Sequence, residues 1–134
     1  MNDSIKLGLR LVGAVAVLLG GSVHLQQWLT VFRDLDIGPL FLLNVVASVV
    51  VGIALLAFDS RLAALGGVLV SVGSLVALYA SRTVGVAGFE ATGYELAEVE
   101  AIVVEGVALV ALGAYLLVAR RPVADSQVGA GAIA

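Results

Sequence analysis

Four long runs of apolar residues, separated by short polar segments, make up most of the sequence. The runs cover approximately residues 7–29, 39–58, 62–81 and 96–119. A helix needs about 20 mostly apolar residues to cross the hydrocarbon core of a bilayer, and each run is about that long. The pattern therefore predicts an all-α fold, an integral membrane four-helix bundle. We assign residues 1–122 to this domain, and the small, weakly polar residues 123–134 to a flexible C-terminal tail.

Local signals predict where the helices begin. Gly38-Pro39 opens the second run, with proline near the first helical position, where its missing N–H costs little. Asp59 or Ser60 can cap the third helix. Thr92, followed three residues later by Glu95, matches a capping box and predicts a start of the fourth helix near residue 93.

Composition agrees with a bilayer as the solvent. Hydrophobic residues make up 61% of the chain and charged residues 13%, against roughly 25% charged in a soluble domain. The net charge of −3 gives no basic footprint for nucleic acid. Without cysteine, the chain has no thiolate metal site or cysteine nucleophile, and one histidine alone makes a protein-only metal site an unfavoured interpretation. No hydrolase or nucleotide-binding motif is present, so we predict no catalytic residue and favour a protein that is not an enzyme.

The N-terminal segment has an alternative interpretation. Lys6 and Arg10, followed by an apolar stretch and small residues at 20–22, resemble a secretory signal peptide. Because the apolar run continues to Leu29, we favour a first membrane span.

Lysine and arginine are distributed unevenly between the two ends of the predicted spans. One end holds five of the seven and the other end holds two, namely Lys6, Arg10, Arg61, Arg120 and Arg121 against Arg33 and Arg82. Cytoplasmic segments carry the excess of these residues. The bias predicts a multi-pass protein of the cell membrane with both termini in the cytoplasm.

Polar residues inside the predicted spans gather at one depth. Glu105 is the most costly of them, because an ionisable group in hydrocarbon costs on the order of 2.5–3.5 kcal/mol. At 1.5 Å per residue, the most polar residue of each of the four spans falls in the outer third of the bilayer, and the inner two thirds hold almost nothing polar besides Ser48 and Ser71. The candidate ligand- or partner-binding residues are His24, Gln27, Asn44, Tyr79, Glu98 and Glu105.

Small residues follow the same helical faces, at steps of three and four. Membrane helices place small residues where they touch one another, so we predict helix contacts at Gly13, Gly20, Ser48, Gly52, Gly67, Ser71, Ser74, Ala101 and Ala108. Val51 and Val110 are predicted to face lipid.

Three interpretations of the polar cluster stay open. The side chains can hold the bundle in register through mutual hydrogen bonds, line a pocket, or dock another subunit.

Three functions follow from these interpretations. The first function we infer is a structural or accessory subunit that packs in lipid against other membrane subunits or copies of itself. The second is a binder or carrier of a small lipophilic or cationic ligand or ion, and the third a redox subunit whose cofactor is ligated by His24.

Three stretches resemble a group of small bacterial four-span membrane proteins. They are His24 late in the first span, the Ile-Gly-Pro-Leu-Phe-Leu-Leu-Asn opening of the second at residues 37–44, and Gly88-Phe89-Glu90 before the fourth. The resemblance implies a four-span fold and carries no activity with it. The chain is unlike small multidrug-resistance transporters, whose essential glutamate lies in the first span, where this chain has none.

The orientation can be tested with single cysteines at Ser126 and Ala91, since the chain has no other cysteine. On intact cells, a membrane-impermeant thiol reagent is expected to label position 91 and to spare position 126. The reverse labelling pattern would show that both termini lie outside.

Overall fold

The computed structural model describes residues 3–120, and these residues form four long helices. They are α1 (Asp3–Gln27), α2 (Gly38–Ala57), α3 (Arg61–Thr83) and α4 (Leu96–Val118), with a π-helical turn, η1 (Trp28–Phe32), continuing α1. Each is long and apolar enough to cross a membrane, which confirms the all-α prediction and the four predicted runs. The predicted tail at 123–134 lies outside the described residues.

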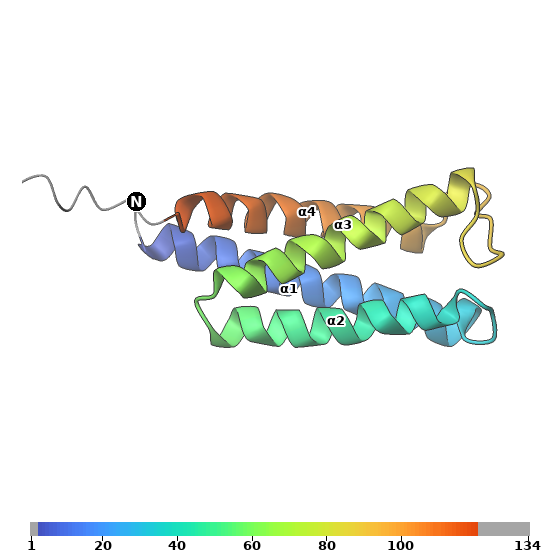
Figure 1. Ribbon diagram of the computed structural model, residues 1–134, viewed down its shortest axis with the longest axis horizontal. Coiled ribbons are helices and arrows are strands. Elements are labelled where there is room, and N and C mark those ends of the chain that lie inside the picture. Colours follow the sequence, from blue (N-terminus) through green and yellow to red (C-terminus); the bar gives the residue numbers. More distant parts are fainter. Residues whose placement is uncertain (1–2, 121–134) are drawn as a thin grey trace, which may run out of the picture.

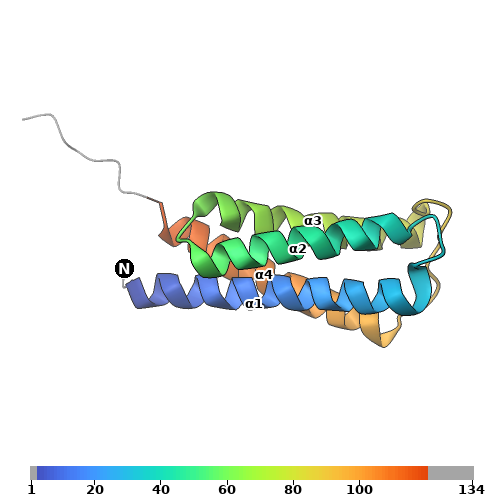
Figure 2. The ribbon, with the colours of Figure 1, turned by 90° about the horizontal axis from the view of Figure 1, so that it is seen from below.

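The helices run along one common axis, so the bundle has two distinct ends (Figures 1 and 2). The terminal end holds the start of α1, the end of α4 and the turn at residues 58–60. The loop end holds the two longer connections, residues 33–37 and 84–95. An even number of helices brings both described chain ends to one side, whereas the assignment of that side to the cytoplasm stays a prediction.

Two of the three predicted helix starts agree with the structure. Helix α2 begins at Gly38 with Pro39 in its first turn, and the Ser60 hydroxyl caps α3 by accepting a hydrogen bond from the Ala63 N–H at 3.2 Å.

The predicted capping box at Thr92 is wrong. Gly93 has a φ of +71°, a left-handed conformation outside any helix. Helix α4 instead begins at Leu96, and the Glu98 carboxylate accepts from the Glu95 N–H at 3.2 Å. Glu98 also binds Arg82 of α3, so a contact between helices stabilises this cap rather than the one suggested by the sequence.

Glycine lets α1 approach both of its principal neighbours closely. Gly13 lies against Leu112 of α4, and Gly21 lies against Ser48 of α2. A Cβ atom at position 21 would lie only 2.7 Å from the Cβ of Ser48. From α2, Gly52 receives the side chain of Leu18. Since lipid tails are as apolar as leucine, such close contacts are the main source of attraction between membrane helices.

The predicted contact residues lie on these inner faces. Those that are buried are Gly13, Gly20, Ser48, Gly52, Gly67, Ser71 and Ala108, and those that are half-buried are Ser74 and Ala101. Val110 is 74% exposed, in agreement with a lipid-facing position. Val51 is not lipid-facing: it is half-buried and packs against the core, because it fills the space left by Gly66 of α3.

The apolar core occupies the terminal end and the middle of the bundle. It consists of Ala14, Ala16, Val17, Leu55, Ala64, Ala108, Leu112 and Tyr115. Four of the eight are alanines, which let the helices approach closely around the side chains of Leu55, Leu112 and Tyr115.

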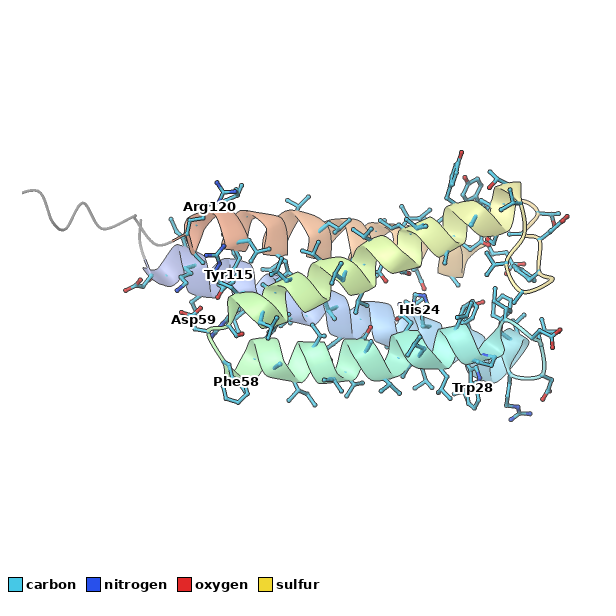
Figure 3. All side chains as sticks on the ribbon, in the orientation of Figure 1. His24, Trp28, Phe58, Asp59, Tyr115 and Arg120 are labelled. Atoms are coloured by element: carbon cyan, nitrogen blue, oxygen red, sulfur yellow. The ribbon has the colours of Figure 1, made fainter. Side chains whose placement is uncertain are left out.

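A polar cluster joins α1, α4 and the α2–α3 turn at the terminal end (Figure 3). Asp59 accepts from the Lys6 ammonium at 2.5 Å and from the Tyr115 hydroxyl at 2.5 Å. The bond from Lys6, and next the bond from Tyr115, hold the pKa of the Asp59 carboxyl below its ordinary value of 3.8. From the sequence, Asp59 was a candidate cap of the third helix, and no role was predicted for Tyr115.

The close contact at Gly67 predicts a marked effect of substitution. A Cβ atom there would lie 2.4 Å from Cδ1 of the buried Leu112, so Gly67→Leu should lower the free energy of unfolding by about 1–3 kcal/mol. Gly113→Leu is the matched control, because a Cβ at this helical glycine meets nothing within 4 Å. Thermal melting in detergent measures both; equal losses would contradict the packing described here.

The Asp59 cluster predicts a pH-dependent contribution to stability. A lowered folded pKa means that the contribution is complete above the ordinary value of 3.8 and is lost as the pH falls through the lowered value. Asp59→Asn should therefore melt below wild type at pH 7, by a small margin because the side chain is 52% exposed. The margin should shrink as the pH falls below 3.8. A margin that grows on acidification would contradict the prediction; Asp36→Asn, exposed at the loop end, is the control.

Candidate functional site: a cavity at the loop end

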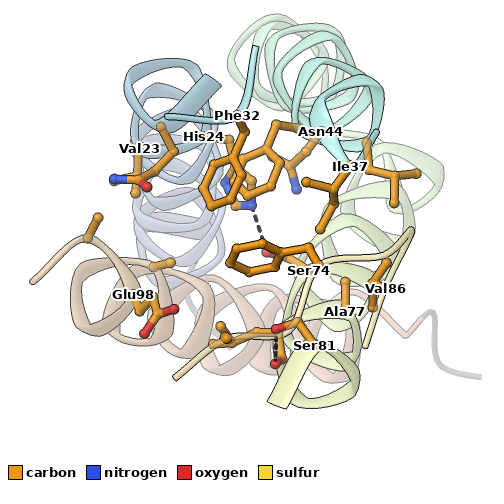
Figure 4. A pocket seen from close by; sticks show the side chains of 18 of the residues that line it. Val23, His24, Phe32, Ile37, Asn44, Ser74, Ala77, Ser81, Val86 and Glu98 are labelled. Carbon is orange, nitrogen blue, oxygen red and sulfur yellow. Dashed lines mark hydrogen bonds between the residues drawn. The ribbon is translucent and has the colours of Figure 1, made fainter. Parts of the chain in front are cut away.

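Helices α2 and α3 diverge toward the loop end, and a cavity of about 690 Å³ lies between the four helices there (Figures 1 and 4). Its wall is mainly apolar. All four helices contribute, together with η1 and the α3–α4 connection. The polar side chains in the wall include His24 and Gln27 of α1, Asn44 of α2, Ser74 of α3 and Glu98 of α4.

His24 is anchored through both ring nitrogens. Its Nδ1 lies 2.8 Å from the carbonyl oxygen of Gly20, and its Nε2 lies 3.2 Å from the hydroxyl of Ser74 (Figure 4). A carbonyl oxygen only accepts, so Nδ1 carries a proton. In the neutral ring Nε2 is then the acceptor and Ser74 donates to it. A cofactor bound at Nε2 would have to displace Ser74, so this geometry favours His24 as a polar anchor over a cofactor ligand.

Asn44 presents its amide N–H groups to the cavity. Its Oδ1 accepts a hydrogen bond from the Ser48 hydroxyl at 3.1 Å, one turn deeper on α2. This bond orients the amide, and the side chain lies between His24 and Ile37 in the cavity wall (Figure 4). The wall therefore offers a donor at Asn44.

Three phenylalanines cover the cavity at the loop end. Phe32 of η1 stacks on Phe41 of α2, with ring centroids 4.2 Å apart, and Phe89 meets Phe32 edge to face at 5.0 Å. Offset and edge-to-face pairs at such spacings are favourable geometries for aromatic rings. We call Phe32, Phe41 and Phe89 the aromatic roof.

A tight turn holds Phe89 in the roof. Val86 and Phe89 exchange two backbone hydrogen bonds, 2.8 and 2.9 Å long. The two residues between them, Ala87 and Gly88, have positive φ values of 47° and 77°, as turns of the I′ class require. Alanine is uncommon in this conformation, so the surrounding contacts maintain the turn.

Three carboxylates of the α3–α4 connection and the start of α4 form a rim at the loop end of the cavity. Glu90, Glu95 and Glu98 all belong to its wall. Glu98 forms an ion pair with Arg82, whose guanidinium lies 3.7 Å from the ring centroid of Tyr94. Three carboxylates against one guanidinium give this rim a net negative charge.

Glu105 lies beneath the cavity rather than in its wall. Its side chain is 2% exposed and packs against Gly20 of α1, where a Cβ would lie 3.1 Å from Oε1. Within residues 3–120, Glu105 Oε1 and the buried Ser71 Oγ have no hydrogen-bond partner. Ala101, one turn along α4, does line the cavity. Two unpartnered polar oxygens therefore lie just below this region.

The structure brings together most of the predicted cluster. His24, Gln27, Asn44 and Glu98 line the cavity, as do Ser74 and Ala101, which we expected to serve helix packing. Tyr79 lies elsewhere and is 71% exposed. Helix α3 presents Ser74, Ala77, Leu78 and Ser81 to the cavity, and this register turns Tyr79 outward.

The aromatic roof was not anticipated as part of the site. Phenylalanines near span ends suggest an interfacial belt. A phenylalanine in the belt and one in the roof both occur near a span end, so the sequence does not distinguish them. A further sign was present in the sequence, since Phe41 lies three residues before Asn44 and therefore on the same helical face.

Within the described part of the chain, no group of three or more histidine or acidic residues is arranged to hold a metal ion. Comparison with known protein families, characterised proteins and solved structures found no match. The resemblance to small bacterial four-span proteins stays an expectation. Its three stretches, at residue 24, residues 37–44 and residues 88–90, all contribute to the cavity wall.

The unpartnered Oε1 atom makes the role of Glu105 testable. Glu105→Leu should be at least as stable as wild type, because it removes a buried polar group that lacks a partner. Ser74→Ala is the contrasting variant, since it removes a bonded partner of His24 and should cost about 1 kcal/mol. Thermal melting in detergent compares them; a Glu105→Leu variant less stable than Glu105→Gln would show that a polar group at this position braces the bundle.

Proposed function

We propose that the protein is a multi-pass protein of the cell membrane that binds a small lipophilic molecule with a polar or cationic head in the cavity at the loop end. One observation carries the proposal: an apolar cavity of about 690 Å³ into which a few polar groups converge. Ligand sites are typically clefts of roughly 300–1,000 Å³ lined by apolar and aromatic side chains with a small number of polar groups.

The charge bias of the sequence supports an orientation with the terminal end in the cytoplasm. The cavity would then lie in the outer half of the bilayer. Its rim of Glu90, Glu95 and Glu98 would face the external medium, and these carboxylates favour cationic over anionic ligands.

Bracing by polar bonds accounts for part of the site but not for its width. The hydrogen bond from Ser74 to His24 joins α3 to α1, whereas the bond from Ser48 to Asn44 lies within α2. A bundle that needed such bonds alone could close around them with small residues, as it does in the core. The separation of α2 from α3 is better explained by a ligand that occupies the space.

A role as an accessory subunit or homo-oligomer is the alternative proposal. The outward faces of all four helices carry exposed leucine, valine and isoleucine, which suit contact with lipid as well as with another helix. We propose no enzymatic activity and no role of His24 as a cofactor ligand.

The proposal is tested by filling the cavity. Ala101 is half-buried and lines it, so Ala101→Phe should displace a bound molecule. Gly106→Phe is the control on the same helix, because a Cβ at Gly106 meets nothing within 4 Å and this residue does not line the cavity.

Each protein is extracted with its surrounding lipid in polymer nanodiscs and examined by native mass spectrometry. Wild type and Gly106→Phe should retain a small molecule near one per chain, and Ala101→Phe should retain about tenfold less, a loss of about 1.4 kcal/mol in affinity. Equal retention by all three, or retention by none, would refute the proposal. Recovery of a second protein subunit with each of the three, without a small molecule, would favour the alternative.

A further inference from the structure

The cavity is open on one side of the bundle, between α2 and α3. Several of its lining residues on these two helices are also exposed on the outer surface of the bundle, namely Leu40, Leu43, Leu69, Gly73 and Ala77. Leu43 is 64% exposed and Leu69 is 70% exposed. In contrast, the lining residues of α1 and α4 are half-buried. The opening therefore faces sideways, along the length of the helices.

Two separate sets of contacts hold the opening apart. The start of α2 is attached to η1, because Phe41 stacks on Phe32 and Gly38 packs against the Phe32 carbonyl oxygen. The end of α3 is attached to the start of α4 through the ion pair of Arg82 with Glu98. Helices α2 and α3 are connected by the short turn at residues 58–60 and pack together near it, as Val51 does against Gly66, and they separate toward the loop end (Figure 1).

Gly73 marks the gap in the wall. A Cβ atom at this position would meet no heavy atom within 4 Å, although the residue lines the cavity. Glycines of the core are in tight contact, as at Gly67, so Gly73 serves no close helix contact. Its lack of a side chain leaves the opening clear.

The loop end of the cavity is closed by comparison. The aromatic roof and the turn at residues 86–89 lie across it. In the bilayer proposed above, the side opening faces hydrocarbon while the roof faces the aqueous medium. A ligand dissolved in the bilayer can thus enter the cavity through the side opening, whereas a ligand from the aqueous medium meets the aromatic roof.

We infer that the cavity takes a single-chain amphiphile with a zwitterionic or cationic head from the bilayer, through the opening between α2 and α3. This inference rests on the proposed function and specifies its ligand. The head lies near His24 and Asn44, beneath the acidic rim, and the chain leaves along Leu43 and Leu69. A volume of about 690 Å³ suits a drug-sized ligand, so one chain fits better than an intact two-chain phospholipid.

The experiment uses the full chain in phosphatidylcholine nanodiscs with lysophosphatidylcholine carrying a photoreactive diazirine in its acyl chain. Labelled residues are mapped by mass spectrometry. Labelling should concentrate on the α2 and α3 residues of the opening, such as Leu43 and Leu69. Lysophosphatidylglycerol of the same chain length should label about tenfold less, because the rim repels its negative head.

Two glycine variants test the route. Gly73→Phe should lower the labelling about tenfold by obstructing the opening, whereas Gly113→Phe, at a glycine with equal free space that lies away from the cavity, should label as wild type. Even labelling around all four helices, or equal labelling by the two head groups, would overturn the inference.

The two cavity variants distinguish failure of the inferred entry route from failure of the proposed function. If Ala101→Phe abolishes ligand retention while Gly73→Phe labels as wild type, the cavity binds a ligand that does not enter between α2 and α3, and the inference is wrong. If neither variant changes retention or labelling, the proposed function is wrong as well.

Discussion

Close contact between α1 and its two main neighbours is the constraint on which the rest of the structure depends. Glycines at positions 13, 21 and 52 leave room for the side chains of Leu112, Ser48 and Leu18, and so bring α1 close to α4 and α2. In a bilayer, helices gain little from hiding apolar surface, so dispersion contacts at short range must hold them together. Such contacts require the helices to stay nearly aligned, and they fix α1, α2 and α4 as one packed unit.

Helix α3 makes different contacts with the bundle at its two ends. Near the terminal end Gly67 admits Leu112 of α4, and the bundle closes around small residues. Toward the loop end α3 is drawn to α4 by Arg82 and Glu98, while α2 remains with η1. The cavity therefore results because α3 stays in contact with α4 at the loop end while it separates from α2 (Figure 1).

The polar groups divide according to these two regions. Asp59, Lys6 and Tyr115 satisfy one another at the terminal end, where they join three parts of the chain. His24 and Ser74 satisfy one another in the cavity wall. Glu105 and Ser71, between core and cavity, retain unpartnered oxygens within the described residues. A buried polar group without a partner costs stability, so these two oxygens do not help to hold the described helices together.

The sequence by itself determined the four helices, the polar layer and most of the small contact residues. Apolar run length, helix caps such as Ser60, and the spacing of small residues are properties of one helix at a time. The divergence of α2 and α3, the outward position of Tyr79, the inward position of Val51 and the aromatic roof were decided by the tertiary structure alone. Each depends on the rotation of a helix about its own axis and on the identity of its neighbour. A helical period shows which residues share a face, but another helix must be in place before that face has a partner.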